Sequence, residues 1–170
     1  LEQYQQARNM SDVMAALTCL VNSSHPEQSA CLQHFYNRWT EEALVIDKWF
    51  SLQASSHRPG TLARVEELLK HPAFDLTAPN RVRSLVGVFS QSNPVAFHAA
   101  SGLGYRFLAD RVLELDPINP QIAARMLTPL TTWHRYDANR QQRMKDELQR
   151  IVQTEPVSGN VYELASKSLE

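Results

Sequence analysis

Apolar residues recur at helical spacing along most of the chain. The clearest case lies near the middle, where four of them occupy positions i, i+3, i+4 and i+7 and so share one face of a helix: Val82, Leu85, Val86 and Phe89. Ser92-Asn93-Pro94 should end this helix, because the residue before a proline disfavours helical geometry. A second helix should follow Gly102-Leu103-Gly104 and reach Leu115.

The connector between these two helices, residues 93–104, is unusually apolar for a loop. It contains Pro94, Val95, Ala96, Phe97, Ala99 and Ala100. An apolar connector must pack against something, and ordered loops often carry function. We therefore expect a packed, non-helical wall, either of a cavity or of a domain contact, with Phe97 and His98 at its centre.

The other helices are predicted from the same stripes together with start and stop signals. Residues expected to cap a helix N-terminus are Thr40, Thr61 and Asn119. Two further helices are expected from Asp137 to Thr154 and from Ser158 to Leu169. Leu44 should belong to the inward stripe of the helix that Thr40 begins. Pro129 interrupts an otherwise regular stripe and should kink its helix, because it lacks the N–H that would bond the carbonyl of Arg125.

These signals predict an all-α chain of about nine or ten helices joined by short connections. Helix pairs recur roughly every 35 to 45 residues, which is the spacing of HEAT-like arrays. The expected fold is an irregular α-solenoid or superhelix of antiparallel helix pairs, HEAT- or armadillo-like, with residues 1–170 forming a single domain. The first helix has no capping residue before it, as expected of a piece of a longer chain.

Composition and charge exclude several functional classes. A net charge of −1 gives no electrostatic reason to bind nucleic acid or an anionic membrane. No apolar run approaches the roughly 20 residues of a transmembrane helix, and the polar start is not a secretory signal. Two cysteines, Cys19 and Cys31, do not make a disulfide framework. A reducing compartment, the cytoplasm, is therefore expected.

The usual catalytic motifs are absent from the sequence. It contains no H-E-x-x-H, G-x-S-x-G, phosphate-binding loop or C-x-x-C. Cys31 and His34 share a helix face, but a zinc site needs three or four ligands, so core packing explains this pair better. His98 is interpreted as a hydrogen-bonded structural residue rather than a catalytic base. No catalytic residue and no metal ligand are predicted.

Two arginines offer the most informative chemistry. Arg83 lies about 100° from the centre of its helix's apolar stripe, and Arg125 is placed similarly on its own helix. Both could form salt bridges or lie at solvated margins, or both could face a cavity and bind a carboxylate with the guanidinium fork. The pattern alone favours the first interpretation. A further basic set is expected only to form a solvated face: Arg140, Arg143, Lys145 and Arg150.

Seven segments, in order, resemble the C-terminal domain of bacterial aminopeptidases N. They are Leu44–Ala54, His71–Asp75, Asn80–Phe89, Asn93–His98, Gly104–Asp110, Leu115–Arg125 and Arg135–Asp137. That family comprises alanyl aminopeptidases of the gluzincin zinc metallopeptidases, which remove N-terminal residues from peptides. The resemblance implies that the zinc ligands and catalytic glutamate belong to a preceding catalytic domain, so this chain alone should hold no cofactor and should not hydrolyse peptides.

The resemblance also implies a role for the two arginines. In the family, the C-terminal domain is a helical superhelix that covers the active-site cavity and controls peptide access, and two of its arginines face the substrate. By motif these match Arg83 in N-R-V-R and Arg125 in I-A-A-R. The implied partners are the catalytic domain of the same polypeptide and peptide substrates. Self-association through the uncovered domain interface is a further expectation, and a free-standing peptide- or protein-binding α-solenoid remains the alternative.

Overall fold

The computed structural model describes all 170 residues, which form helices and connecting segments. The helices are α1 (Glu2–Gln6), α2 (Met10–Val21), α3 (Gln28–Arg38), α4 (Ala43–Ala54), α5 (Thr61–Leu68), α6 (Pro79–Val82), the π-helix η1 (Arg83–Gly87), α7 (Val88–Ser92), α8 (Pro94–Phe97), α9 (Leu103–Leu115), α10 (Pro120–Thr131), the 3₁₀-helix η2 (Trp133–Arg135), α11 (Ala138–Val152) and α12 (Gly159–Leu169). None of them is both long enough and apolar enough to cross a membrane.

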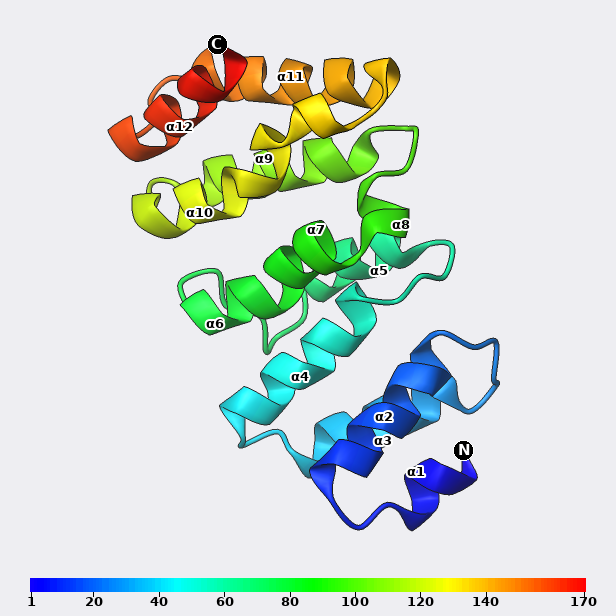
Figure 1. Cartoon of the computed structure of the whole chain (residues 1–170). Coiled ribbons are helices and arrows are strands. Elements are labelled where there is room, and N and C mark those ends of the chain that lie inside the picture. Colours follow the sequence, from blue (N-terminus) through cyan, green and yellow to red (C-terminus); the bar gives the residue numbers. More distant parts are fainter.

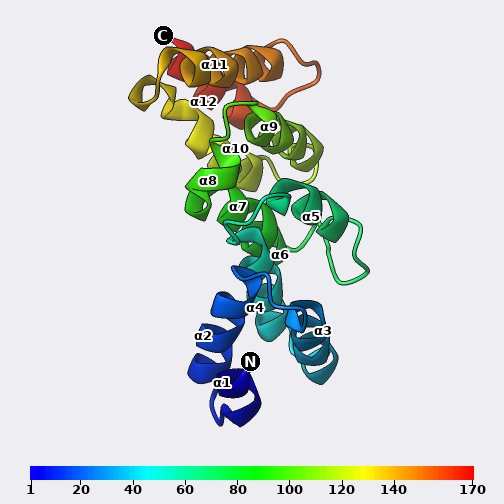
Figure 2. The ribbon, with the colours of Figure 1, turned by 90° about the vertical axis from the view of Figure 1, so that its right-hand side faces the viewer.

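The helices stack into an elongated column. Figure 1 shows α1, α2 and α3 at one end and α11 and α12 at the other, with the chain termini far apart, and the turned view in Figure 2 shows the same order. Successive helices run back and forth across the column and contact the next layer, as α9 and α10 contact α11 and α12. The predicted all-α solenoid is confirmed.

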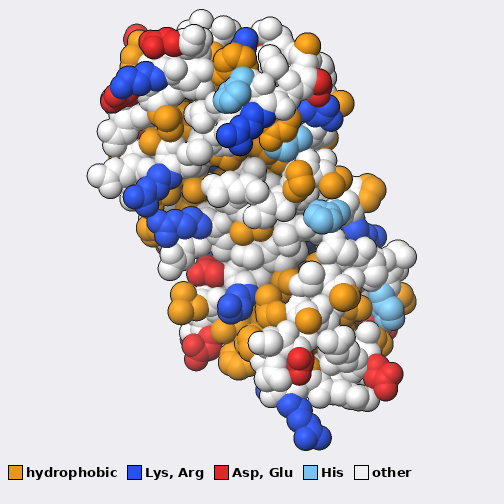
Figure 3. All heavy atoms as spheres, in the orientation of Figure 1, with side chains coloured by type: hydrophobic (Ala, Val, Ile, Leu, Met, Phe, Trp, Pro, Cys, Tyr) orange, Lys and Arg blue, Asp and Glu red, His pale blue; other side chains and the backbone are white.

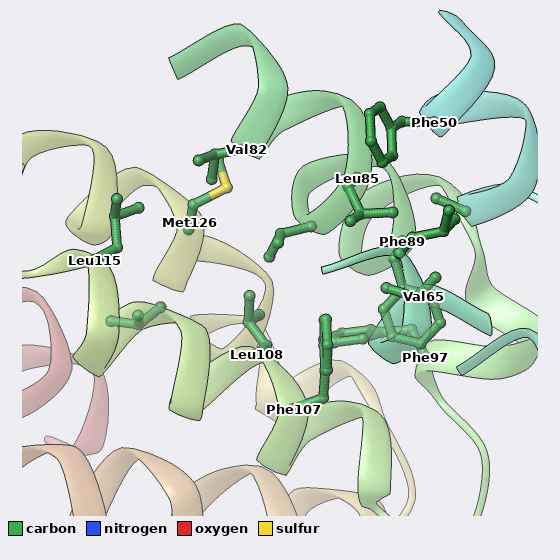
Figure 4. Packing of buried hydrophobic residues seen from close by; sticks show 14 of the residues in the cluster. Phe50, Val65, Val82, Leu85, Phe89, Phe97, Phe107, Leu108, Leu115 and Met126 are labelled. Atoms are coloured by element: carbon green, nitrogen blue, oxygen red, sulfur yellow. The ribbon is translucent and has the colours of Figure 1, made fainter. Parts of the chain in front are cut away.

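One continuous hydrophobic core of 34 buried residues runs through the column. The central stripe predicted from periodicity is fully part of it, because Val82, Leu85, Val86 and Phe89 are each no more than 1% exposed. Figure 4 shows Phe89 beside Phe97 and Phe107, which come from α8 and α9. These aromatic rings meet edge to face, an arrangement favoured by their quadrupoles.

One of the three predicted caps is confirmed and two are wrong. The Asn119 side chain accepts the backbone N–H of Ile122, as predicted, and Asp137 and Ser158, expected only as helix starts, cap α11 and α12 in the same way. Thr40 caps nothing: α4 begins only at Ala43, and Leu44, predicted to point inward, is 69% exposed. Thr61 is the first residue of α5 rather than its cap.

Local geometry at Thr61 explains the second error. Gly60 precedes it with a φ of 85°, and the Thr61 hydroxyl donates backwards to the carbonyls of Ser56 and Arg58. A glycine adopts this left-handed conformation without the steric cost that other residues incur. The threonine therefore closes the preceding loop instead of satisfying the helix N–H groups.

The helix around the central stripe and the connector after it differ from the prediction. Residues 79–92 form one helical rod interrupted by the π-helical segment η1, which periodicity did not indicate. The connector is not wholly irregular, because Pro94–Phe97 form the single turn α8, capped by the Asn93 side chain. These pieces raise the helix count above the expected nine or ten. Pro129 lies inside α10, and the kink there stays a prediction.

Candidate functional site

Arg83 stands at the first position of η1 with its side chain exposed. Its guanidinium donates one hydrogen bond, from Nη1 to Asn80 Oδ1 at 3.3 Å, and it takes part in no ion pair within 4 Å. The π-helical turn that Arg83 begins is a rare conformation that occurs frequently at functional sites. Its charge is therefore available to a ligand.

Arg125 lies on α10, also with its side chain exposed, and forms no hydrogen bond or ion pair through that side chain. The salt-bridge interpretation of both arginines therefore has no support within this chain. By contrast, five other arginines pair with carboxylates: Arg64, Arg81, Arg111, Arg140 and Arg150.

The π-helix η1 contacts α10 close to the positions of both arginines. A β-carbon built on Gly87 of η1 would lie 3.7 Å from Arg83 Cβ and 3.7 Å from the sulfur of Met126, the neighbour of Arg125. Figure 4 shows Met126 beside Val82 at this contact. On the face drawn in Figure 3, basic side chains gather at the left edge, where α6 and α10 approach each other in Figure 1.

A polar groove of about 480 Å³ lies beside Arg125. Its walls come from α7, the connector, α10 and the turn after η2, and its lining residues are Ser90, Gln91, His98, Arg125, Thr128, Pro129, Thr132 and Tyr136. Arg125 contributes the one full charge among them, because the group contains no carboxylate or lysine and burial lowers the pKa of His98. The groove is therefore suited to an anionic or strongly hydrogen-bond-accepting group.

His98 lines this groove and takes part in three hydrogen bonds. Its Nδ1 lies 2.9 Å from the Tyr105 hydroxyl, its Nε2 lies 2.9 Å from the Tyr136 hydroxyl, and its carbonyl accepts a 2.7 Å bond from Arg140 Nε. Burial and then the Arg140 charge lower the pKa of His98, so the imidazole is neutral at neutral pH. The prediction that His98 is hydrogen-bonded is confirmed.

The connector around His98 is packed on both sides. Phe97 is fully buried, and Asn93, also fully buried, donates to the carbonyls of Ala54 and Ser56 at 2.9 and 2.7 Å. From α11, Arg143 donates to the carbonyl of Ser101 at 2.9 Å. The connector is therefore a fixed wall. Phe97 packs into the core on one side of it, and His98 lines the groove on the other.

Two of the four α11 residues expected to form a solvated face instead hold this wall. Arg140 and Arg143 reach 42 residues back along the chain to the connector carbonyls of His98 and Ser101. Lys145 lies 3.9 Å from the centre of the Trp133 ring, and Arg150 pairs with Asp110 at 2.7 Å. The assignment as a merely solvated face was wrong, because helix periodicity does not reveal partners that are distant in sequence.

No third metal-ligating side chain lies with Cys31 and His34. The Tyr4 hydroxyl lies 3.2 Å from the Cys31 carbonyl and 2.8 Å from His34 Nδ1, and both cysteines are free thiols. Throughout the structure, no group of three or more His, Cys, Asp or Glu side chains could hold a metal ion. The residues of this chain therefore do not fit a zinc site.

Sequence reasoning missed Tyr136, Gln91 and Thr128 as groove residues. They stand on three separate elements, and only the packing of α7 and α10 with the connector brings them together. Tyr136 lies directly before the Asp137 cap of α11, where the signal was interpreted only as a helix start. The sequence offered no periodic signal for these residues.

Comparison with known proteins finds a matching family and similar sequences. The family described as "Domain of unknown function (DUF3458_C) ARM repeats" matches residues 1–170. The chain is 43% identical over 168 residues to aminopeptidase N of Escherichia coli (strain K12) and 44% identical over 163 residues to that of Caulobacter vibrioides, covering 99% and 96% of this chain. It spans only 19% of the length of each relative.

A solved structure agrees with these relatives. The crystal structure of Legionella pneumophila aminopeptidase A in complex with aspartic acid superposes with a TM-score of 0.94 at 36% identity, covering 99% of this chain and 20% of that chain. The resemblance to the C-terminal domain of bacterial aminopeptidases N is thus confirmed. The chain belongs to the ARM-repeat family DUF3458_C, and its relatives are aminopeptidases of which it corresponds to one domain.

Proposed function

We propose that this chain is the non-catalytic C-terminal domain of a zinc aminopeptidase, that it covers the active-site cavity, and that Arg83 and Arg125 face the peptide substrate. The observation that carries the proposal is the state of these two arginines. Both are exposed on neighbouring elements, and neither has a carboxylate partner in the chain. Guanidinium groups without a carboxylate partner, one of them lining a polar groove, attract and bind the free carboxylate of a short peptide.

In this proposal, zinc and the peptide-bond chemistry belong to the preceding catalytic domain, which is the main partner. Exposed apolar side chains on the connector side are suited to that contact: Val95 is 60% and Leu103 is 55% exposed. The same surface would permit self-association of the isolated domain. The cytoplasm is the proposed compartment.

The proposal predicts a binding defect when both charges are removed. In the full-length polypeptide, changing Arg83 and Arg125 together to alanine should raise KM for tripeptides by about tenfold, since hydrogen bonds to charged groups contribute about 1.5–3 kcal/mol each when buried and less when exposed. The value of kcat should change much less, because these contacts would bind ground state and transition state alike. Steady-state peptide hydrolysis measures both constants.

A charge-matched control separates this effect from general electrostatics. Arg8 and Arg106 are also exposed and form no ion pair, but they line hollows away from the groove. The Arg8→Ala/Arg106→Ala enzyme loses the same net charge and should retain its KM within about twofold. Equal KM changes in the two double variants, or none in either, would reject the substrate-facing role.

A further inference from the structure

The hydrogen bonds around His98 determine where its proton lies. Tyr105 is fully buried, and His98 Nδ1, at 2.9 Å, is the single hydrogen-bond partner of its hydroxyl. A buried hydroxyl proton without an acceptor costs about 1–3 kcal/mol. The Tyr105 hydroxyl therefore donates to Nδ1, and Nδ1 must be the unprotonated nitrogen of the imidazole.

This tautomer fixes the role of the second tyrosine. Neutral imidazole carries one N–H, so Nε2 holds the proton and donates it to the Tyr136 oxygen at 2.9 Å. The Tyr136 ring also stacks on His98, with ring centres 4.2 Å apart and planes at 26°. Tyr136 is thus held in place while its own hydroxyl proton remains free to donate.

The free hydroxyl lies in the same groove as Arg125. The other hydroxyls there are mostly engaged: Ser90 donates to the carbonyls of Val86 and Gly87, and Thr132 donates to that of Pro129. Gln91 and Thr128 add neutral polar groups. A charged donor and an oriented neutral donor, without a competing carboxylate, form the usual recognition pattern for a carboxylate.

We propose that the Tyr136 hydroxyl, positioned by His98, is a second ligand-binding group beside Arg125, and that the groove holds the C-terminal carboxylate of the peptide substrate. This inference rests on the proposed function and names the part of the substrate that occupies the groove. Tyr136 touches the carboxylate, whereas His98 is a positioning residue whose two ring nitrogens are both hydrogen-bonded, to Tyr105 and to Tyr136. The arrangement selects for short peptides with a free C-terminus over blocked ones.

The test uses the full-length polypeptide and a matched pair of tripeptides, one with a free C-terminal carboxylate and one with a C-terminal amide. The measured quantity is the ratio of KM for the amide to KM for the acid. Tyr136→Phe removes only the hydroxyl and should lower this ratio by about five- to tenfold, because a hydrogen bond to the charged end is lost. Tyr162→Phe, which changes an exposed tyrosine of α12, should leave the ratio as it is in the unaltered enzyme.

A second variant tests the role of His98. His98→Phe removes both hydrogen bonds while keeping a ring, and it should lower the same ratio. Adding Tyr136→Phe to it should then change the ratio by less than twofold, because the hydroxyl is no longer oriented. A purely structural role for His98 would raise KM for both peptides equally and leave the ratio unmoved.

The outcomes also separate this inference from the proposed function. If the Arg83/Arg125 double variant raises peptide KM but Tyr136→Phe leaves the amide-to-acid ratio unchanged, the groove assignment is wrong and the domain role stands. If Tyr136→Phe raises KM equally for the acid and the amide peptide, the lost hydrogen bond was not made to the carboxylate. A lowered ratio in Tyr136→Phe and His98→Phe, with none in Tyr162→Phe, supports the assignment.

Discussion

Replacing Arg81 by methionine is expected to lower the free energy of unfolding by about 3–5 kcal/mol, because it strands a largely buried carboxylate. Arg81 Nε bonds Asp47 Oδ1 at 2.7 Å, and the two side chains are only 11% and 16% exposed. The guanidinium also bonds the carbonyl of Ala73 and lies 5.0 Å from the centre of the Phe50 ring. Denaturant unfolding of the variant measures the loss.

Two comparisons make the Arg81 prediction specific. Lys167→Met breaks an ion pair with Glu163 in which both side chains are about two-thirds exposed, so its effect should stay below about 1 kcal/mol. Adding Asp47→Asn to Arg81→Met should recover part of the stability, because the unpaired charge is removed. An Arg81 variant no less stable than Lys167→Met would contradict a structural role for this ion pair.

Changing Gly104 to alanine is the second large effect, with an expected loss of about 3 kcal/mol. A β-carbon there would overlap the carbonyl oxygen of Phe97 and lie 2.9 Å from its Cα. These are backbone atoms of α8, and the buried Phe97 side chain prevents the turn from moving away. The connector that carries His98 should therefore shift. This shift should change the shape of the groove, in addition to lowering the free energy of unfolding.

Gly159 provides the matched control for Gly104. It begins α12, and a β-carbon on it would have no neighbour within 4 Å. Gly159→Ala should therefore be neutral or slightly stabilising, by less than about 1 kcal/mol. Similar thermal or denaturant midpoints for the two alanine variants would show that α8 and α9 do not approach as closely as described.

The fold was predictable because local patterns specify most of it. The central stripe is buried, and Asn119 caps α10 as its chemistry requires. Leu44 was misplaced because the helix starts three residues after Thr40, which turns the side chain to solvent. The π-helical turn at Arg83 was not predictable, since it depends on packing against other helices rather than on local propensity.

The sequence pattern could not predict the different environments of two neighbouring arginines. Arg81 and Arg83 stand two residues apart on opposite margins of one stripe, and the pattern treats them alike. In the structure, Arg81 is part-buried against Asp47, 34 residues away, whereas Arg83 is exposed without a carboxylate partner. Only the resemblance to aminopeptidases singled out Arg83, and only the three-dimensional packing revealed Tyr136 beside Arg125.

The most direct test of the central proposal is a structure of the full-length polypeptide with a non-hydrolysable peptide analogue bound. We expect a guanidinium nitrogen of Arg83 or Arg125 within about 3 Å of the analogue, the distance of a charge-assisted hydrogen bond. The groove beside Arg125 should hold the analogue's carboxylate. Both arginines turned to bulk solvent, or paired with carboxylates of the remaining polypeptide while the analogue lies elsewhere, would contradict the proposal.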